Sequence, residues 1–403
     1  MTNSRRDAIF VMTRWLETHD FPDRMLPQHE DRAFVTDLVY TAIRRHRSLV
    51  WILEQCVKKM PKGETQAALL IGATQVLFMP SVADYAAIHE TVEAVKLSTR
   101  EAAGFVNAVL RTILRQREAF LAALEKQPIG IKTSHPESLV TRWTERFGAE
   151  ETEALCTWDN QPAETWLAWP PTAPERFTKL PRGTRVEEVE GYAEGRFVVQ
   201  DPATAGAIDL LDIKPGQAVL DACAAPGGKT IQIAWRMGTP AAGTKNTHRL
   251  VALDLHEDRL VTLRANLART QQTWVTVASG DFTQDPAPLR AQFGLFDRIL
   301  LDVPCSNTGV LRRRPDARWR WTTKRMKQLC QMQATLLANA CTLLAPGGRL
   351  VYSTCSLEPE ENRQQITALR KCMPNIACVG VIEHLPTRTQ TDGAFACALE
   401  REG

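Results

Sequence analysis

The spacing of apolar positions predicts that the first part of the chain is helical. Up to about residue 125, apolar side chains recur three and four positions apart, as at Phe34, Leu38 and Ala42. This spacing buries one face of a helix. It predicts helices over 31–57, 67–78, 88–97 and 105–114, with breaks at 61–63 and 80–81. We therefore expect an all-helical domain over residues 1–125.

Residues 126–200 mix helical and extended patterns. Apolar spacing predicts helices over 137–147 and 150–158, and short strands over 166–169 and 196–199. The proline-rich stretch 170–181 is expected to be a loop, because proline has no backbone N–H to donate to a sheet. We interpret residues 126–200 as a small α+β connector.

From residue 201 to 403, short apolar runs alternate with amphipathic stretches, which is typical of a parallel, doubly wound α/β sheet. The pattern predicts strands over 218–222, 250–254, 275–279, 296–303 and 349–354, helices over 230–237, 257–268, 323–344 and 358–371, and a closing hairpin of 377–382 with 394–399. Ligands of such sheets bind beyond the carboxyl ends of the strands. The residues at those ends are therefore the candidates for function.

Two of the predicted strands are followed by a cysteine, Cys305 in one case and Cys355 in the other. A cysteine is usually a small buried hydrophobic residue, but these two stand where a sheet presents side chains to a ligand. Three successive strands also end in an acid: Asp254, Asp281 and Asp302. Asp254 is placed to accept hydrogen bonds from two ribose hydroxyls, and Asp281 is placed to contact the edge of an adenine. The alternative for each acid, a helix cap or turn residue, stays open.

The loop after the first predicted strand of this sheet is a candidate cofactor loop. It consists of Cys223, Ala224, Ala225, Pro226, Gly227, Gly228 and Lys229. Its small residues let the backbone approach a ligand, and the helix that follows offers free N–H groups. Neither the P-loop pattern nor GxGxxG is complete here, which disfavours a nucleoside triphosphate and NAD. A functional role for Lys229 stays open, although solvation at the helix start is the more common role of such a lysine.

Composition limits the partners and the cellular location that we expect. The 403 residues carry a net charge of +3, so any nucleic-acid contact must come from local clusters. Ten cysteines without CxxC pairs argue against a zinc site and against a secreted disulfide scaffold. No apolar run is long enough for a signal peptide or a membrane span. We expect a cytoplasmic protein with no metal and no membrane partner.

Two basic regions are candidates for RNA contact. The helical part contains Arg44-Arg45-His46-Arg47 and a second set of Arg111, Arg115 and Arg117, for which a solvated face is an equally good interpretation. Residues 312–321 interleave arginines with two tryptophans. Such a mixture suits phosphate contact and base stacking on single-stranded or opened RNA. A merely solvated basic face is less favoured, because exposed tryptophans are costly and the stretch adjoins the predicted site.

Three motifs resemble those of the RNA 5-methylcytosine methyltransferases of the Sun/RsmB and NSUN group: 221–230, 302–306 and 354–356. Asp392-Gly393-Ala394-Phe395 is similar to that group's closing strand. Residues 87–93 and 104–111 are similar to the NusB-type RNA-binding domain that bacterial small-subunit ribosomal RNA enzymes of the group carry. Val303 and Asn307 depart from the pattern, which usually has Ala and Gly there.

The resemblance implies a Rossmann-like, S-adenosylmethionine (SAM)-dependent methyltransferase domain over 201–403, preceded by a NusB-like domain and the connector. SAM would be held by residues 223–229 with Asp254, Asp281 and Asp302, and ribosomal RNA would be methylated on cytosine carbon 5 by a monomer. The resemblance assigns the nucleophile to Cys355 and product release to Cys305. An acid near ring nitrogen 3 would stabilise the negative charge that develops there, and Asp302 is placed for that role or for the SAM amino group.

Two other interpretations fit parts of the sequence. DNA cytosine methyltransferases use the cysteine of the proline–cysteine motif together with Glu-Asn-Val, whereas here Glu361-Asn362 is followed by Arg363 and is interpreted as the polar start of a helix. A non-catalytic RNA-binding or assembly factor with a methyltransferase fold is the alternative from another class. Retention of both cysteines and all three acids argues against it.

Overall fold

The computed structural model describes residues 4–240 and 248–402, and the chain divides into two compact units. Unit 1 comprises Met1–Gln161 together with Leu311–Trp321, and unit 2 comprises Pro162–Val310 and Thr322–Gly403. The stretch 126–200 therefore contributes to both units. A short segment from beyond residue 310 belongs with the N-terminal helices.

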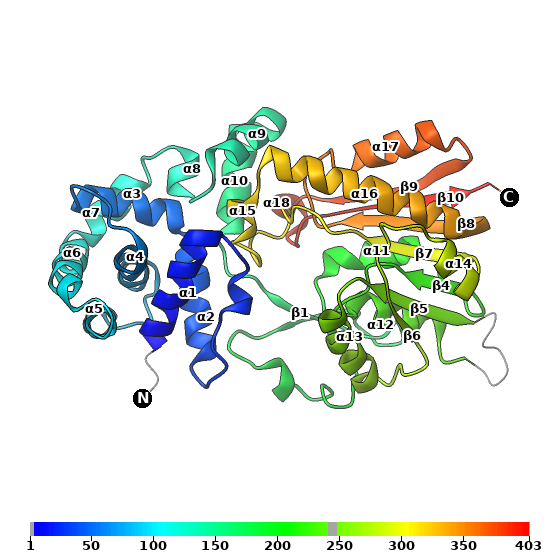
Figure 1. The fold of residues 1–403 in the computed structure, drawn as a ribbon, viewed down its shortest axis with the longest axis horizontal. Helices are drawn as coiled ribbons and strands as arrows, with labels where there is room; N and C mark the ends of the chain where they lie inside the picture. The colour runs from blue at the N-terminus through cyan, green and yellow to red at the C-terminus, as the bar shows by residue number, and fades with distance from the viewer. Residues whose placement is uncertain (1–3, 241–247, 403) are drawn as a thin grey trace. The chain divides into compact units, whose positions relative to one another are not determined.

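Unit 1 is helical throughout the part described (Figure 1). Its α-helices are α1 (Ser4–Thr18), α2 (Arg32–Arg44), α3 (His46–Cys56), α4 (Gly63–Phe78), α5 (Asp84–Lys96), α6 (Ala103–Arg115), α7 (Arg117–Leu124), α8 (Ile129–Lys132), α9 (Glu137–Phe147), α10 (Ala149–Asp159) and α15 (Ala317–Arg320). Short 3₁₀ turns lie at η1 (Pro22–Arg24) and η2 (Arg100–Ala102).

Helix α4 lies at the centre of unit 1. Every residue from Ala67 to Val76 is buried, because its apolar and small residues surround the helix instead of forming one stripe. Helices α1, α2, α5 and α6 all contact it. The prediction of one helix over 31–57 was wrong, since the backbone leaves helical geometry at Arg45 (φ −100°, ψ 11°) and separates α2 from α3.

Unit 2 begins with a three-stranded antiparallel sheet in the order β2-β1-β3. The strands are β1 (Thr165–Ala168), β2 (Phe177–Leu180) and β3 (Val198–Val199). The prediction that 170–181 is all loop was wrong, because Phe177–Leu180 pairs with β1. The prolines flank this strand and leave four residues free to form ladder hydrogen bonds. Turns η3 (Val186–Glu188) and η4 (Pro202–Thr204) and helix α11 (Ala205–Leu210) lead onward.

The second sheet of unit 2 has seven strands in the order β6-β5-β4-β7-β8-β10-β9. Its strands are β4 (Ala218–Asp221), β5 (Arg249–Asp254), β6 (Thr276–Ser279), β7 (Phe296–Asp302), β8 (Leu344–Thr354), β9 (Ile376–His384) and β10 (Ala394–Arg401). The first five strands of that order are parallel, and the β9–β10 hairpin joins β8 in antiparallel fashion. The predicted α/β sheet with a closing hairpin is confirmed.

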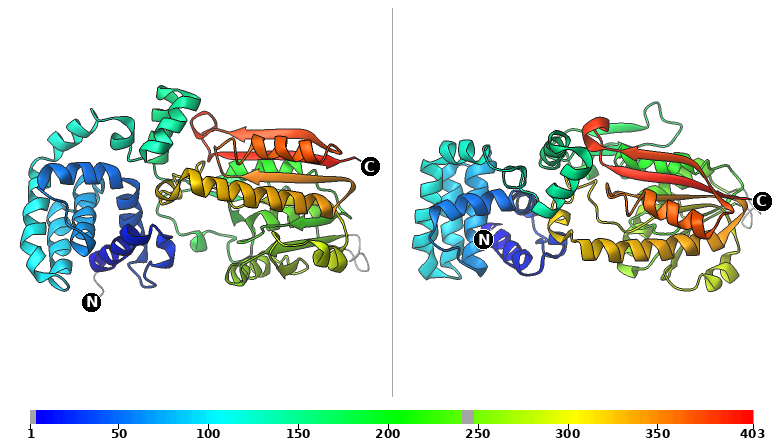
Figure 2. Two further views of the ribbon diagram at one scale, coloured as in Figure 1. Left: turned by 45° about the horizontal axis from the view of Figure 1, so that its top comes forward. Right: turned by 90° about the horizontal axis from the view of Figure 1, so that it is seen from above.

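Helices cover both faces of this sheet (Figure 2). Residues of α16 (Thr323–Leu343) and α17 (Arg363–Cys372) pack on one face, with α14 (Ala287–Phe293) at its margin. Residues of α11, α12 (Gly228–Met237) and α13 (Glu257–Arg269) pack on the other. The short helix α18 (Pro386–Thr389) lies in the hairpin. Since the strands are buried on both faces, the exposed carboxyl ends are where unit 2 presents polar groups.

Candidate active site at the ends of the parallel strands

The loop between β4 and α12 approaches the end of β5. The carboxylate of Asp254 is buried and accepts from the backbone N–H of Ala225 at 3.1 Å and of His256 at 3.2 Å. Gly227 has φ 106°, a left-handed conformation that favours glycine, and it turns the chain into α12. Asp254 therefore lies against the loop of residues 223–229 at Ala225. That these residues hold a cofactor stays a prediction.

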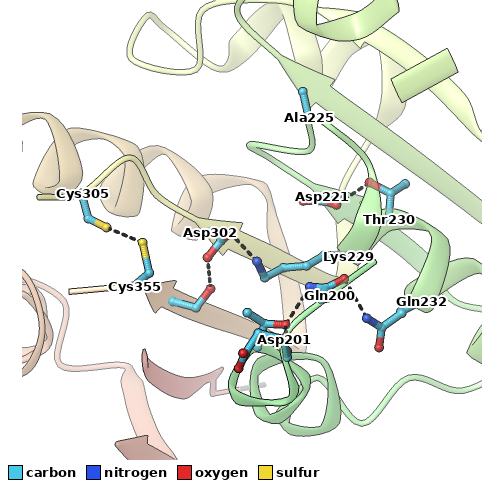
Figure 3. Close-up of polar contacts among 12 residues, drawn as sticks. Gln200, Asp201, Asp221, Ala225, Lys229, Thr230, Gln232, Asp302, Cys305 and Cys355 are labelled. Carbon is cyan, nitrogen blue, oxygen red and sulfur yellow. Dashed lines mark hydrogen bonds and ion pairs between the residues drawn. The ribbon is translucent and has the colours of Figure 1, made fainter. Parts of the chain in front are cut away.

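Two further acids flank this loop. Asp281, beyond β6, is partly exposed, and hydrogen bonds from Thr283 and Gln284 lower the pKa of its carboxyl group. Asp221 ends β4 and accepts from Thr230 Oγ1 at 2.6 Å (Figure 3). Burial raises the pKa of Asp221 to about 7. Together with Asp254 on β5, these acids stand at the ends of the three adjacent strands β4, β5 and β6.

Asp302 links the cofactor loop to the cysteine loops. Lys229 Nζ lies 2.7 Å from Asp302 Oδ2, and Ser353 Oγ donates to Asp302 Oδ1 at 2.7 Å (Figure 3). The Lys229 side chain is only 18% exposed, so the interpretation that it is solvated at the helix start was wrong. The attraction of Asp302 raises the pKa of Lys229 in spite of burial, which by itself would lower it. Lys229 is therefore a cation held beside the two cysteines' loops.

The two cysteines that follow β7 and β8 meet at the site. Cys305 Sγ lies 3.2 Å from Cys355 Sγ, and both side chains are partly exposed (Figure 3). The hydrogen bond with Cys355 and burial together raise the pKa of Cys305 well above its ordinary value. Cys355 Sγ also donates to Asn307 Oδ1 at 3.1 Å. The two sulfurs are thus close enough to act on one group, and Cys305 stays protonated.

A buried carboxylate that the sequence interpretation missed joins the two cysteine loops. Glu361 Oε1 accepts from Ser306 N at 2.9 Å and from Gln333 Nε2 at 3.0 Å. Glu361 Oε2 accepts from Ser356 Oγ at 2.6 Å and from Ser306 Oγ. Glu361 was interpreted as the polar start of a helix, yet α17 begins only at Arg363. An acid six positions after Cys355 was the only signal, and it did not indicate the direction of the side chain.

The loop after Cys305 also contacts the strand β10. Gly309 N donates to Cys355 O at 2.9 Å, and Gly393 N donates to Gly309 O at 2.8 Å. A Cβ atom on Gly309 would lie 2.6 Å from the carbonyl oxygen of Gly393, so no larger residue fits there without movement. This close approach fixes the loop that carries Cys305 against the one that carries Cys355.

The segment 311–321 is not the exposed basic and aromatic surface that the sequence predicted. Arg318 is fully buried in unit 1, where it donates to Asn160 Oδ1 at 3.0 Å and to the Asp159 carbonyl at 3.2 Å. Trp321 is 8% exposed, and Trp319 Nε1 donates to Ile43 O at 2.9 Å. Trp319 packs against the core of unit 1 and Trp321 is buried, so these two rings do not form the base-stacking surface that the sequence predicted.

Comparisons with known proteins agree with this architecture. The family model "16S rRNA methyltransferase RsmB/F" matches residues 208–399, and the "NusB family" model matches residues 2–115. A probable ribosomal RNA small subunit methyltransferase B from Synechocystis is 33% identical over 402 residues, covering 90% of this chain and 88% of its own length. The chain belongs to this methyltransferase family. A second member, from Proteus mirabilis, is 32% identical and covers 93% of this chain and 91% of its own length.

A solved structure shares the whole fold. The protein titled "Crystal Structure of PH0851" superposes with a TM-score of 0.78 at 22% identity, covering 100% of this chain and 99% of that one. Among the residues that the structure describes, no helix is long and apolar enough to cross a membrane. Residues 4–240 and 248–402 also contain no group of three or more His, Cys, Asp or Glu side chains suited to a metal ion.

Proposed function

We propose that this protein transfers a methyl group from SAM to carbon 5 of a cytosine in small-subunit ribosomal RNA through a covalent bond between Cys355 and the base. Family membership supports ribosomal RNA methylation. The observation that carries the finer proposal is the pair of cysteine sulfurs 3.2 Å apart, beside a lysine–aspartate pair.

The chemistry of cytosine explains why these groups are needed. Carbon 5 is a weak nucleophile until a thiolate adds to carbon 6, which places electron density on carbon 5 and ring nitrogen 3. We assign this attack to Cys355 Sγ. The Lys229–Asp302 pair holds a proton that it can present to nitrogen 3 as negative charge develops there. SAM, when bound, supplies the electrophilic methyl group.

The coupling between the sulfurs supports a role for Cys305 in the second half of the reaction. The hydrogen bond with Cys355 is the largest cause of the raised pKa of Cys305. Once Cys355 Sγ is bonded to carbon 6, that cause is gone, and the partly exposed Cys305 loses its proton to solvent more easily. Cys305 Sγ can then take the proton from carbon 5, and the electron pair of that C–H bond expels Cys355 Sγ.

The residues at the strand ends suit SAM as the cofactor. We propose that residues 223–229, Asp254, Asp281 and Asp302 hold it, with the carboxylates facing hydroxyl, amino and adenine donors. The buried carboxylate of Asp254 fits this role, because Oδ2 accepts from one partner, Ala225 N at 3.1 Å, and keeps a lone pair for a ligand, whereas Oδ1 accepts from His256 N at 3.2 Å and pairs with Arg259 Nη1 at 3.4 Å. We assign catalysis to residues 201–403 and RNA contact to the NusB-like helices of residues 1–125.

Replacing each cysteine separately tests this mechanism. Cys355→Ala should abolish methylation and form no adduct, because no bond to carbon 6 can form. Cys305→Ala should accumulate a covalent protein–RNA species in the presence of SAM, because attack and methyl transfer proceed while elimination stalls. The adduct is measured as a shifted band on a denaturing gel, with ribosomal RNA from cells that lack the protein as substrate.

The double variant Cys305→Ala/Cys355→Ala is the control, and it should form no adduct. Trapping by Cys355→Ala in place of Cys305→Ala would reverse the two roles. Full activity in both single variants would refute the covalent mechanism, and bisulfite sequencing that finds no cytosine change in deleted cells would refute the ribosomal substrate.

A further inference from the structure

Helices α5 and α6 lie side by side in unit 1 (Figure 1) and line a groove of about 530 Å³. Ligand sites in proteins typically measure about 300–1,000 Å³. Ile88, Val92 and Ala103 form an apolar part of the lining and are buried. Aromatic, amide and charged side chains complete it. The groove therefore combines the size of a ligand site with apolar and polar partners for a ligand.

Two aromatic rings of α5 line this groove. Tyr85 and His89 are one helical turn apart, with ring centroids separated by 5.1 Å and an angle of 13° between their planes. Tyr85 is 74% exposed, so the face of its ring that His89 does not cover is open to solvent. A third flat ring can continue this stack and remove the exposed aromatic surface from water.

The charged side chains of the groove favour an anion. Its two acids are both paired, Asp84 with Arg117 and Glu93 with Lys96 Nζ at 2.6 Å. Arg111 is exposed, and it forms no ion pair with any residue that the structure describes. Arg111 is thus a cation whose two terminal nitrogens can contact a phosphate group.

The contact between Arg111 and Asn107 leaves a hydrogen-bond donor for a ligand. Arg111 Nε donates to Asn107 Oδ1 at 3.1 Å, which fixes the amide oxygen on the side of the arginine. The NH₂ group of Asn107 can then donate to an acceptor on the edge of a base. A nucleotide supplies all three complementary features: a flat ring, an acceptor on its edge and a negative phosphate.

We propose that the groove between α5 and α6 binds a nucleotide of single-stranded RNA, with the base stacked on Tyr85 and a phosphate at Arg111. Bases of a duplex are already paired and stacked, so the ligand is an unpaired nucleotide. The proposal rests on the RNA contact that we assign to residues 1–125, and it names the groove that makes this contact.

The fluorescence of a modified base tests the stacking in the full-length protein without SAM. The probe is a short oligouridine with one central 2-aminopurine, whose fluorescence falls when it stacks on an aromatic ring. Tyr85→Ala should remove most of this quench and raise the Kd about fivefold to a hundredfold, the range for loss of one base–aromatic stack. Tyr85→Phe keeps the ring and is the control, with a Kd within about twofold of the wild type.

The salt dependence of binding separates the stacked base from the phosphate. Tyr85→Ala removes no phosphate contact, so the slope of log Kd against log salt concentration should not change. Arg111→Ala should instead reduce that slope by about 0.7, the value for one phosphate of a single strand.

Gly104 provides a second test that leaves Tyr85 in place. It lines the groove at the start of α6, and a Cβ atom added to it meets no neighbouring side chain within 4 Å. Gly104→Leu therefore occupies the groove without displacing a neighbour, and it should weaken binding and quench as Tyr85→Ala does. Ala108→Leu adds leucine at an exposed position of α6 outside the lining, and this matched control should bind as the wild type does. Thermal unfolding checks that each variant is folded.

Wild-type affinity and quench in both Tyr85→Ala and Gly104→Leu would overturn the proposal and leave the groove to another occupant, such as a protein segment. A probe that the wild-type protein does not quench would overturn it as well. The assay contains no SAM, so a chain without cytosine-C5 activity would still quench the probe. Conversely, adduct formation by Cys305→Ala at saturating RNA would support the proposed chemistry even if the groove bound no nucleotide.

Discussion

The loops that follow β7 and β8 and the segment 311–321 both contain residue types that are typical of function, and the fold uses them in opposite ways. The loops bring Cys305 and Cys355 to within 3.2 Å of each other and leave both partly exposed. The segment buries Arg318 completely and Trp321 almost completely among the helices of unit 1.

The difference lies in what each pattern constrains. The end of a parallel strand has a defined place in the fold, so a residue there is brought to the same edge as its counterparts on neighbouring strands. A run of arginines and tryptophans has no such defined place in the fold, since its aromatic rings can pack in a core as well as they can stack on a nucleobase. Arginine can follow them inside when carbonyl and amide oxygens accept its N–H groups.

Loss of the buried arginine should give the largest effect. Arg318→Met keeps much of the side-chain volume but leaves the oxygens of Asn160, Ser134 and Asp159 without their donor. We expect unit 1 to lose about 3 kcal/mol of stability, because breaking one side of a buried polar network costs that much. Thermal unfolding, with hydrogen exchange at α9 and α10, measures the change.

Arg314→Met is the matched control. Arg314 is in the same segment, but its side chain is 48% exposed and pairs with Asp23 at the surface, so its loss should cost under about 1 kcal/mol. Equal effects of the two substitutions would mean that segment 311–321 is not part of the core of unit 1.

Removing the negative charge of Glu361, which contacts both cysteine loops, should have the next largest effect. Glu361→Gln keeps the shape but removes an acceptor for the hydroxyls of Ser306 and Ser356. We expect kcat for ribosomal RNA methylation to fall about tenfold to a hundredfold, because both cysteine loops lose a shared support. KM for the RNA should change little, since the Glu361 side chain is fully buried and is not presented to the RNA.

The same substitution should change the protonation of one cysteine. The negative charge of Glu361 contributes to the raised pKa of Cys305, after Cys355 and burial, so Glu361→Gln should lower that pKa. Iodoacetamide should then alkylate Cys305 faster at any given pH below that pKa. The rate is followed by mass spectrometry of the tryptic peptide 299–312, in which Cys305 is the single cysteine. A fall in stability without any change in Cys305 alkylation would limit Glu361 to a scaffold role.

The smallest effect concerns RNA binding. Arg111 and Arg115 on α6 are exposed, and their hydrogen bonds go to Asn107 and Thr112 of the same helix. Replacing both with Ala should reduce the salt slope of RNA binding by about 0.7 for each single-strand phosphate that α6 no longer neutralises. Arg314→Met is again the comparison, and an equal reduction by it would restore segment 311–321 as an RNA-binding surface.

Much of unit 2 could be predicted because its strands are continuous apolar runs. Alternation predicted the parallel sheet and its hairpin, and the strand ends indicated Asp254, Asp302, Cys305 and Cys355 as neighbours. What each side chain contacts across the sheet could not be predicted. Solvation was the more favoured interpretation of Lys229, yet it pairs with Asp302, because nothing in local spacing specifies which strand end faces the start of α12.

The contacts of Glu361 and Asn307 could not be predicted from the sequence for a related reason. Each is a polar residue just beyond a recognisable motif, where turn or helix-start roles are more common than buried contacts. Their partners are about 50 residues away in sequence, as in the contacts of Glu361 with Ser306 and of Asn307 with Cys355. Only the folded loops bring these groups together.

The discontinuous make-up of unit 1 has a consequence for the order in which the protein is made. Its helices end at Gln161, but the segment that completes their core begins at Leu311, roughly 150 residues later. At about 5–20 residues per second, translation needs on the order of ten to thirty seconds to supply it. During that interval the ring of Trp15, which Trp319 later contacts edge-on, has one neighbour fewer. The N-terminal helices thus emerge from the ribosome first but reach their final packing only after four of the seven strands of the large sheet have been synthesised.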